Sequence, residues 1–269
     1  MKKSLRRWAT AVFIGVVAAI YCNFAIETDE WVVTSDRLPK AFDELRIALL
    51  TDIHGGQLGP DSSTLLAEVK KTDPDYIALS GDLVDEDSDL SMLEPLLKGL
   101  ADIAPTFYVS GNHEWRMDDP EAVFAKIAGQ VTALRNDYLR LEKDGETMIL
   151  AGAEDPNGYA DMETPEALMA RIREEVPGDP YIALLYHRND ILSQWAELNA
   201  DLVLSGHGHG GVIRLPFIGG LLGTDRTFFP DNDEGLYTLD RTTMAVSRGL
   251  GGVRLWNRPH LPVIVLKKG

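Results

Sequence analysis

Cysteine is almost missing from this chain of 269 residues. The single cysteine, Cys22, lies inside an apolar N-terminal segment. The rest of the chain therefore forms no disulfide, and cysteine use says little about the redox compartment. Without further thiolates, a closed structural zinc site is also disfavoured.

Basic residues are scarce as well. Only 22 Lys and Arg stand against 42 Asp and Glu in residues 27–269, a net charge of −20. Such a chain repels nucleic acid, which is bound by neutralising phosphates, whereas bound cations would still permit an anionic small substrate. The Walker A motif and the Gly-x-Ser-x-Gly elbow are both missing. Nothing in the sequence thus favours a nucleic-acid binder, an NTPase or a serine hydrolase.

One long apolar run is present at the N-terminus. Four basic residues within 2–7 precede residues 8–26, which carry no charge, and acidic residues follow. Roughly 20 apolar residues span a bilayer as a helix, and a basic flank stays cytoplasmic. We therefore expect residues 1–30 to be a signal anchor, a single-pass transmembrane helix with the catalytic domain outside the cell membrane. The alternative is a cleaved signal peptide and a secreted protein.

Residues 31–43 are interpreted as a tether, and residues 44–269 as one domain of class α/β. Strands are expected at 45–50, 75–80, 105–110, 181–186 and 201–205, and helices at 61–71, 92–103, 120–128, 165–175 and 190–198. This alternation is typical of βαβ units and a largely parallel sheet. Short strands at 131–134, 138–142 and 147–151 predict a second, mixed sheet. The tail adds β-like segments at 212–215, 235–239, 244–247 and 263–266.

Metal-capable side chains follow five of the expected strands directly. They are Asp52 with His54, Asp82, Asn112, His187, and His207 with His209. Open α/β sheets bind ligands outside the carboxyl ends of their strands, so we expect these side chains to converge. Gly81, Gly111 and Gly206 precede three of them, and each is expected to let the backbone turn sharply without a Cβ clash.

Histidine is concentrated at the same points. Five of the six histidines lie in or beside these motifs, and only His260, expected to be a surface or packing residue, lies elsewhere. Imidazole and carboxylate suit Zn, Fe, Mn or Ni. Seven candidate ligands are too many for one ion with an open position, but two ions sharing a bridging carboxylate use them well. Two-metal sites about 3.5–4 Å apart serve phosphoryl chemistry.

Together these motifs resemble the signature of the calcineurin-like metallophosphoesterases. The matching residues are Asp52-x-His54, Gly81-Asp82, Gly111-Asn112-His113-Glu114, His187 and Gly206-His207-x-His209. Residues 210–216 and 246–251 further resemble the exported or membrane-anchored bacterial phosphodiesterase branch. The likeness covers roughly residues 40–269. It implies a four-layer α/β/β/α sandwich of two mixed sheets flanked by helices.

The resemblance also implies a role for each residue of the site. One metal would be bound by Asp52, His54 and His209, and the other by Asn112, His187 and His207, with Asp82 bridging both. The catalytic residue would be His113, which would orient the phosphoryl group and protonate the leaving oxygen.

Three further residues are candidates for supporting roles. Asp85 and Glu114 are able to orient imidazoles, although ordinary caps or surface charges are the equal alternative. Arg188 replaces the more usual Asn-Pro that follows the histidine, so we expect it either to contact substrate phosphate or to be a solvated residue at a helix start.

The expected enzyme hydrolyses phosphodiester or pyrophosphate bonds with a hydroxide that bridges two metal ions, namely Mn, Fe, Zn or Ni. Its partner would be a phosphate-containing small molecule or a lipid, because the apolar loop 217–222 with Phe228 and Phe229 suggests a lipid-bearing substrate. That loop could equally pack over the second sheet. The alternatives are a phosphomonoesterase or nucleotide hydrolase, and a non-catalytic metal-binding scaffold of the same fold. The sequence leaves the oligomeric state open.

Overall fold

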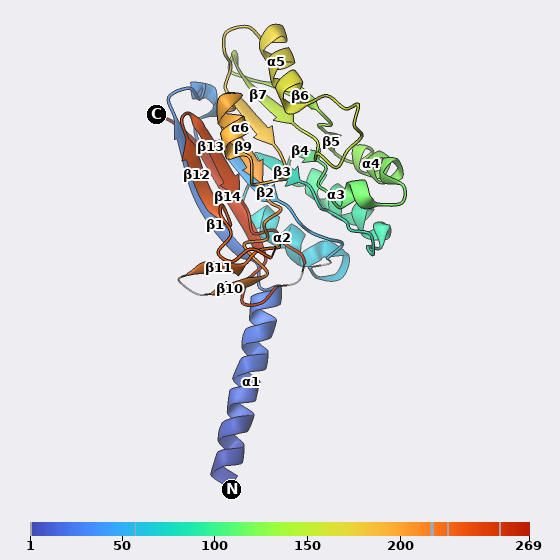
Figure 1. The fold of residues 1–269 in the computed structure, drawn as a ribbon, viewed down its shortest axis with the longest axis vertical. Coiled ribbons are helices and arrows are strands. Elements are labelled where there is room, and N and C mark those ends of the chain that lie inside the picture. The colour runs from blue at the N-terminus through green and yellow to red at the C-terminus, as the bar shows by residue number, and fades with distance from the viewer. Residues whose placement is uncertain (1, 57, 216–217, 225, 253) are drawn as a thin grey trace.

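Two six-stranded sheets form the centre of the domain (Figure 1). The computed structural model describes residues 2–56, 58–215, 218–224, 226–252 and 254–269. The first sheet has, in spatial order, β1 (Glu27–Ser35), β14 (His260–Lys268), β2 (Arg46–Leu50), β3 (Tyr76–Ser80), β4 (Thr106–Val109) and β5 (Thr132–Ala133). The second has β12 (Gly235–Leu239), β13 (Thr242–Val246), β9 (Leu202–Ser205), β8 (Ile182–Leu185), β7 (Glu146–Gly152) and β6 (Asp137–Lys143).

Both sheets are mixed. In the first sheet β2 to β5 are parallel, while β14 is antiparallel to β2. In the second, β13, β9, β8 and β7 are parallel, and the edge strands β12 and β6 are antiparallel to their neighbours. The expected α/β class with two large mixed sheets is therefore confirmed. One assignment was wrong: the strand expected at 131–134 belongs to the first sheet as β5, because it pairs with β4. The β-like segment expected at 263–266 is part of β14.

Helices cover the outer face of each sheet. The first sheet packs against α2 (Ser63–Lys71), α3 (Leu93–Ala101) and α4 (Pro120–Ala128), and the second against α5 (Pro165–Glu175) and α6 (Leu192–Glu197). Alternation along β2 shows how the strands serve two cores, since Ala48 and Leu50 face the helices whereas Ile47 and Leu49 face the other sheet. The layers are thus helix, sheet, sheet and helix (Figure 1).

The predicted tether at 31–43 is incorrect. Residues 27–35 form β1, which pairs in parallel with β14 along nine positions. A short 3-10 helix, η1 (Lys40–Phe42), follows and buries Phe42 completely. An edge strand with alternating polar residues has a composition similar to that of a linker, so the sequence alone did not distinguish the two. Beside β1, His260 is fully buried and packs against Trp31, with ring centroids 5.3 Å apart.

The N-terminal segment is one helix, α1 (Lys2–Phe24), which projects away from the domain (Figure 1). Among the residues described, no helix has the length and apolar character needed to cross a membrane. The expected transmembrane helix is therefore not confirmed.

Shorter elements connect the layers. A hairpin of β10 (Ile213–Leu215) and β11 (Gly219–Leu222) lies at the end of the domain from which α1 leaves (Figure 1). Three further 3-10 helices are η2 (Pro60–Ser62), η3 (Leu90–Met92) and η4 (Glu114–Arg116). Phe217, part of the apolar loop singled out in the sequence, lies outside the described residues.

Candidate metal centre

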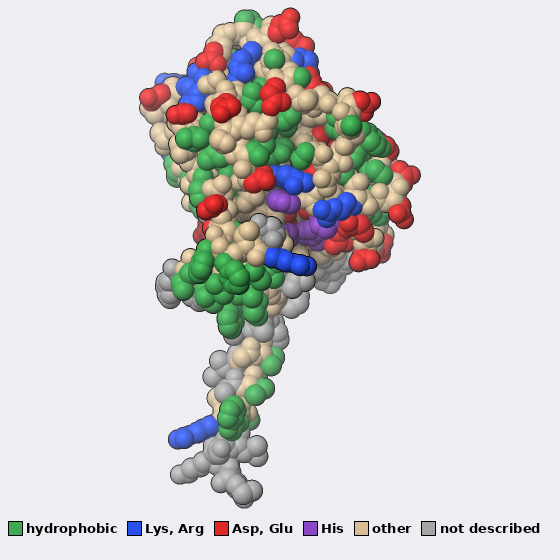
Figure 2. Space-filling model, in the orientation of Figure 1, with side chains coloured by type: hydrophobic (Ala, Val, Ile, Leu, Met, Phe, Trp, Pro, Cys, Tyr) green, Lys and Arg blue, Asp and Glu red, His purple; other side chains and the backbone are tan. Residues whose placement is uncertain are grey.

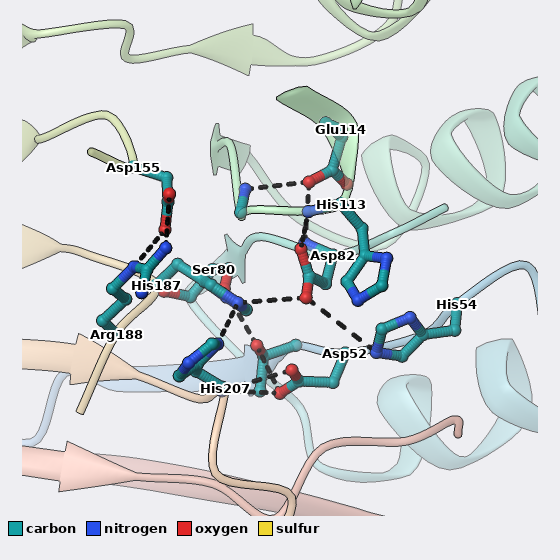
Figure 3. Close-up of polar contacts among 12 residues, drawn as sticks. Asp52, His54, Ser80, Asp82, His113, Glu114, Asp155, His187, Arg188 and His207 are labelled. Carbon is teal, nitrogen blue, oxygen red and sulfur yellow. Dashed lines mark hydrogen bonds and ion pairs between the residues drawn. The ribbon is translucent and has the colours of Figure 1, made fainter. Parts of the chain in front are cut away.

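The carboxyl ends of five strands, from both sheets, meet at one place. Turns after β2, β3 and β4 carry Asp52 with His54, Asp82, and Asn112; turns after β8 and β9 carry His187, and His207 with His209. The turns are bonded to each other: the backbone N–H of Asp52 donates to the carbonyl of Gly81, and that of His54 donates to the carbonyl of Asp82. Adjacent parallel strands thus hold the predicted ligands together, as Figure 3 shows.

One group of donor atoms belongs to Asp52, His54 and His209. The Nε2 atoms of the two histidines are 3.1 Å apart, and Nε2 of His209 is 3.4 Å from Oδ1 of Asp52. The ligand atoms of all three residues lie within 4.8 Å of one another, which is close enough to hold one cation.

A second group belongs to Asp82, His187 and His207. Nε2 of His187 is 3.1 Å from Oδ2 of Asp82 and 3.2 Å from Nδ1 of His207. Asp82 joins the two groups, because its Oδ2 is also 3.9 Å from Nε2 of His54. The carboxylate of Asp82 thus faces histidines of both groups (Figure 3).

Asn112 gives an independent test of whether these residues fit a metal. Its side-chain Oδ1 is buried and has no hydrogen-bond partner among the described residues. A buried acceptor without a partner costs about 1–3 kcal/mol, so such atoms are rare unless something else satisfies them. An amide oxygen beside imidazole and carboxylate is a good oxygen ligand for a divalent ion. The residues present therefore fit a metal centre.

The charge states also favour cation binding. Burial lowers the pKa of His207 and of His209 to about 4, so both imidazoles are neutral and able to ligate near neutral pH. Burial opposes the charged form of Asp52, but the nearby histidines outweigh it and lower the pKa of that carboxyl. His187 differs: burial opposes its charge, yet Asp82 and Asp52 outweigh burial and raise its pKa to about 10. A metal would have to displace that proton.

The backbone at the site is unusual. Asp52, His54, Asp82, His207 and His209 all adopt positive φ, between 50° and 67°. The expectation for the glycines was only partly correct, because Gly81 alone of the three has a positive φ, 81°. Gly111 and Gly206 are needed for space: a Cβ at Gly111 would meet Oδ1 of Asp82, and one at Gly206 would meet Asp52.

His113, the predicted catalytic residue, lies beside the first group. Its ring centroid is 4.8 Å from that of His54, and its backbone N–H donates to Oδ1 of Asp82 at 2.8 Å. Nδ1 of the ring is 2.8 Å from Oε2 of Glu86. Glu86 thus holds the ring, a role that the sequence did not reveal.

Asp85 lies near His54. Its Oδ2 is 3.6 Å from Nδ1 of His54, and its Oδ1 accepts a bond from the Ser88 hydroxyl at 2.6 Å. The separation from His54 is longer than a hydrogen bond, so a role of Asp85 in orienting that imidazole stays a prediction.

Glu114 joins two of the turns. The side chain is fully buried and accepts backbone N–H bonds from Asp82 at 2.9 Å, Gly111 at 2.8 Å and Leu83 at 2.5 Å (Figure 3). Burial and the charge of Asp82 raise the pKa of Glu114 to about 8. Its contacts are to the backbone rather than to an imidazole, so it fixes the turns that carry Asp82 and Asn112.

A pocket of about 340 Å³ opens over the two groups. Arg188 and Arg116 line it together with His113 and Thr224. The guanidinium of Arg188 is fixed by two bonds to the buried carboxylate of Asp155, at 2.7 and 3.0 Å. Figure 2 shows basic side chains beside the histidines.

Sequence reasoning overlooked Arg116, Glu86 and Asp155. Arg116 follows the Asn112-to-Glu114 motif by two residues and was detectable from that spacing. Glu86 and Asp155 had no motif to mark them, since both depend on how distant loops pack.

Comparisons with known proteins agree with this geometry. The sequence profile of calcineurin-like phosphoesterases matches residues 45–211. The chain is 30% identical to the uncharacterized metallophosphoesterase YkuE of Bacillus subtilis, covering 90% of this chain and 86% of that protein. It is 28% identical to a transmembrane protein with a metallophosphoesterase domain of Danio rerio, covering 98% of this chain and 64% of the relative. It is 26% identical to the phosphodiesterase YaeI of Escherichia coli, with 82% of each chain covered.

Proposed function

We propose that this chain, which belongs to the calcineurin-like phosphoesterase family, is a dinuclear metal-dependent hydrolase of phosphodiester or pyrophosphate bonds. The predicted enzyme class, a hydrolase acting on phosphoric esters, is confirmed by that membership. The observation that carries the finer proposal is the position of Asp82 between the two donor groups, with Oδ2 3.1 Å from Nε2 of His187 and 3.9 Å from Nε2 of His54, beside the unpartnered Oδ1 of Asn112.

The proposed ligand sets are those of the sequence. Asp52, His54 and His209 would hold one ion, and Asn112, His187 and His207 the other, with Asp82 between them. When bound, two cations would supply a water acidified enough to attack phosphorus, together with positive charge opposite the phosphoryl oxygens. The donors suit Mn, Fe, Zn or Ni, which the ligand types alone do not distinguish.

His113 would serve the leaving group. Glu86 accepts from Nδ1–H at 2.8 Å, which would leave Nε2 to face the substrate. When the bond from phosphorus to the leaving oxygen breaks, that oxygen would gain the Nε2 proton of the imidazolium form of His113, which becomes a neutral ring. Water supplies the oxygen that becomes bonded to phosphorus.

Arg188 and Arg116 support a substrate with a second anionic group. Bound metal ions would neutralise the scissile phosphoryl group, and these two arginines add further positive charge in the same pocket. Asp155 holds the guanidinium of Arg188 in one orientation, and a fixed planar donor suits phosphate oxygens. A pyrophosphate, or a diester whose leaving group is anionic, matches this arrangement better than a simple monoester.

The place of action is proposed to be the outer surface of the cell membrane. The basic residues at the N-terminus and the uncharged run 8–26 support it. A relative of Danio rerio is named a transmembrane protein with a metallophosphoesterase domain, which agrees with that location. Membership of the exported or membrane-anchored branch stays a prediction.

Hydrolysis by defined variants tests the catalytic proposal. Asp82→Asn should abolish metal-dependent hydrolysis of a chromogenic phosphodiester and reduce the metal content found by elemental analysis. His113→Ala should slow hydrolysis about 10²–10⁴-fold while two ions per chain remain. Full activity in Asp82→Asn would refute the proposed metal centre. A metal-loaded chain that hydrolyses no ester would refute catalysis and favour a scaffold.

Arg188→Lys tests the substrate class. Lys keeps the charge but loses the planar fork, so KM for a pyrophosphate substrate should rise about tenfold, with kcat and the KM for a neutral-tailed diester unchanged. Faster hydrolysis of monoesters than of diesters or pyrophosphates by the unaltered chain would instead identify a phosphomonoesterase.

A further inference from the structure

A large apolar surface lies at the end of the domain from which α1 leaves. Five side chains form it, and each is substantially exposed: Ile218 63%, Phe228 72%, Phe229 62%, Leu255 45% and Trp256 52%. We call these five residues the apolar patch. Figure 2 shows hydrophobic side chains gathered over this end, beside the base of α1. Contiguous apolar surfaces of this kind mark interaction sites on soluble domains.

The patch is one structural unit. Leu222 of β11 forms a β-bridge with Phe228, and Ile213 of β10 forms one with Leu255. The backbone N–H of Phe229 donates to the carbonyl of Leu221 at 3.1 Å. The β10–β11 hairpin therefore joins both apolar segments, one through each of its strands.

The patch continues into the base of α1. Arg258, two residues after Trp256, donates through Nε to the carbonyl of Ala25 at 2.9 Å and through Nη2 to the carbonyl of Ile26 at 2.8 Å. Its guanidinium also lies 4.8 Å from the ring centroid of Tyr21. The loop that carries Leu255 and Trp256 is thereby fixed to the helix.

The helix itself indicates what covers this end. Trp8, Val12, Phe13, Val16, Val17 and Tyr21 are all exposed on α1. At about 100° per residue they spread over roughly 220° of the helix circumference. A folded partner docks against one stripe of a helix, whereas lipid surrounds it, and apolar residues on most sides indicate a lipid environment. Exposed Phe and Trp side chains at this end of the domain also suit the boundary between headgroups and acyl chains.

We propose that the apolar patch inserts into the surface of a phospholipid bilayer and orients the domain on it. The contact does not require that α1 cross the membrane. It also places the catalytic pocket near the lipid, because Thr224 lines that pocket and belongs to the same turn that leads from β11 to Phe228. Combined with the proposed function, on which this consequence alone rests, the arrangement favours substrates whose phosphate groups lie at the bilayer surface.

Lipid quenching of a probe on the full chain tests the contact. In a Cys22→Ala background, Phe228→Cys is labelled with an environment-sensitive fluorophore and mixed with vesicles of phosphatidylethanolamine and phosphatidylglycerol that contain a nitroxide-labelled lipid. Asp144→Cys, at the β6–β7 turn far from α1 (Figure 1), is the matched control. We expect a blue shift and severalfold stronger quenching at position 228 than at position 144. Ile218→Cys provides a second probe should labelling at 228 disturb the fold.

Other outcomes would overturn the inference. Equal quenching at both positions would mean that the domain has no fixed orientation, and no quenching at 218 or 228 would mean that the patch faces water or protein. A blue shift that depends on protein concentration without vesicles would indicate self-association instead. Because no hydrolysis is measured, Asp82→Asn should give the same quenching, so failure here is distinct from failure of the catalytic proposal.

Discussion

Replacing Glu114 by Gln tests whether a buried carboxylate holds the metal centre together. Glu114 contacts no substrate position, yet its two oxygens accept N–H bonds from the backbone of both ligand-bearing turns, after β3 and after β4. Gln is nearly the same size, so the substitution leaves no cavity. It changes one acceptor oxygen into an NH₂ group that faces an N–H donor.

The size of the effect follows from these bonds. One carboxyl oxygen accepts from Leu83 and, at 3.4 Å, from Val84, and the other accepts from Asp82 and Gly111, so Gln loses two bonds whichever way its amide turns. Burial and the charge of Asp82 raise the pKa of Glu114 to about 8, so the group is largely uncharged near neutral pH, where each hydrogen bond contributes about 0.5–1.5 kcal/mol. We expect a net destabilisation of about 2 kcal/mol and metal affinity about 10–100-fold lower.

Urea unfolding followed by tryptophan fluorescence measures the first quantity in the metal-free chain, and calorimetric titration with Mn²⁺ measures the second. Glu142→Gln, at an exposed position of β6, is the control and should change neither. If Glu114→Gln matched that control in both measurements, the turns would not depend on the carboxylate, and the reasoning would be wrong.

Two further predictions concern glycine and pH. Gly206→Ala should lower Mn²⁺ affinity at least about tenfold, because a Cβ there would clash with Thr51 and with the carboxylate of Asp52. Gly129→Ala, with an ordinary φ and only ordinary van der Waals contacts for the new Cβ, should not lower it. Calorimetry distinguishes the two variants. Burial raises the pKa of Glu154 above its usual 4.5, so the folded state holds the carboxyl proton more tightly than the unfolded state does. The contribution of this group to the free energy of unfolding is therefore present below pH 4.5 and is lost as the pH rises through the folded pKa. Glu154→Gln should flatten the fall of unfolding free energy over that window, and an unchanged slope in urea titrations would contradict the assignment.

The buried strands could be predicted closely from the sequence, but the edges could not. The run predicted at 75–80 appears as β3 at Tyr76–Ser80, because a strand buried on both faces is apolar throughout. In β1, by contrast, buried and exposed residues alternate and acidic side chains are frequent, so composition suggested a tether. Pairing between β1 and β14 joins residues more than 200 positions apart, and no local pattern encodes such a contact.

The candidate ligands could be predicted as a set because each follows an apolar strand directly. Residues that support them were harder to find. Glu86 holds His113 from a loop after β3, and Asp155 holds Arg188 from a loop after β7. Both are acidic residues in a chain with 42 Asp and Glu, so residue type alone could not distinguish them from solvated surface charges.

The backbone of the site explains why ligands and strand ends coincide. Five predicted ligands adopt positive φ, a conformation that costs a non-glycine residue on the order of 1 kcal/mol or more. Only contacts with neighbouring structure can stabilise so many residues in this conformation. Here the turns are hydrogen-bonded to one another: the N–H of His207 donates to the carboxylate of Asp52, and the N–H of His113 donates to that of Asp82. Each of these two carboxylates therefore fixes another turn while keeping oxygen lone pairs for a cation. Because the same atoms stabilise the turns and face the site, loss of one carboxylate should loosen the fold around the centre as well as remove a ligand.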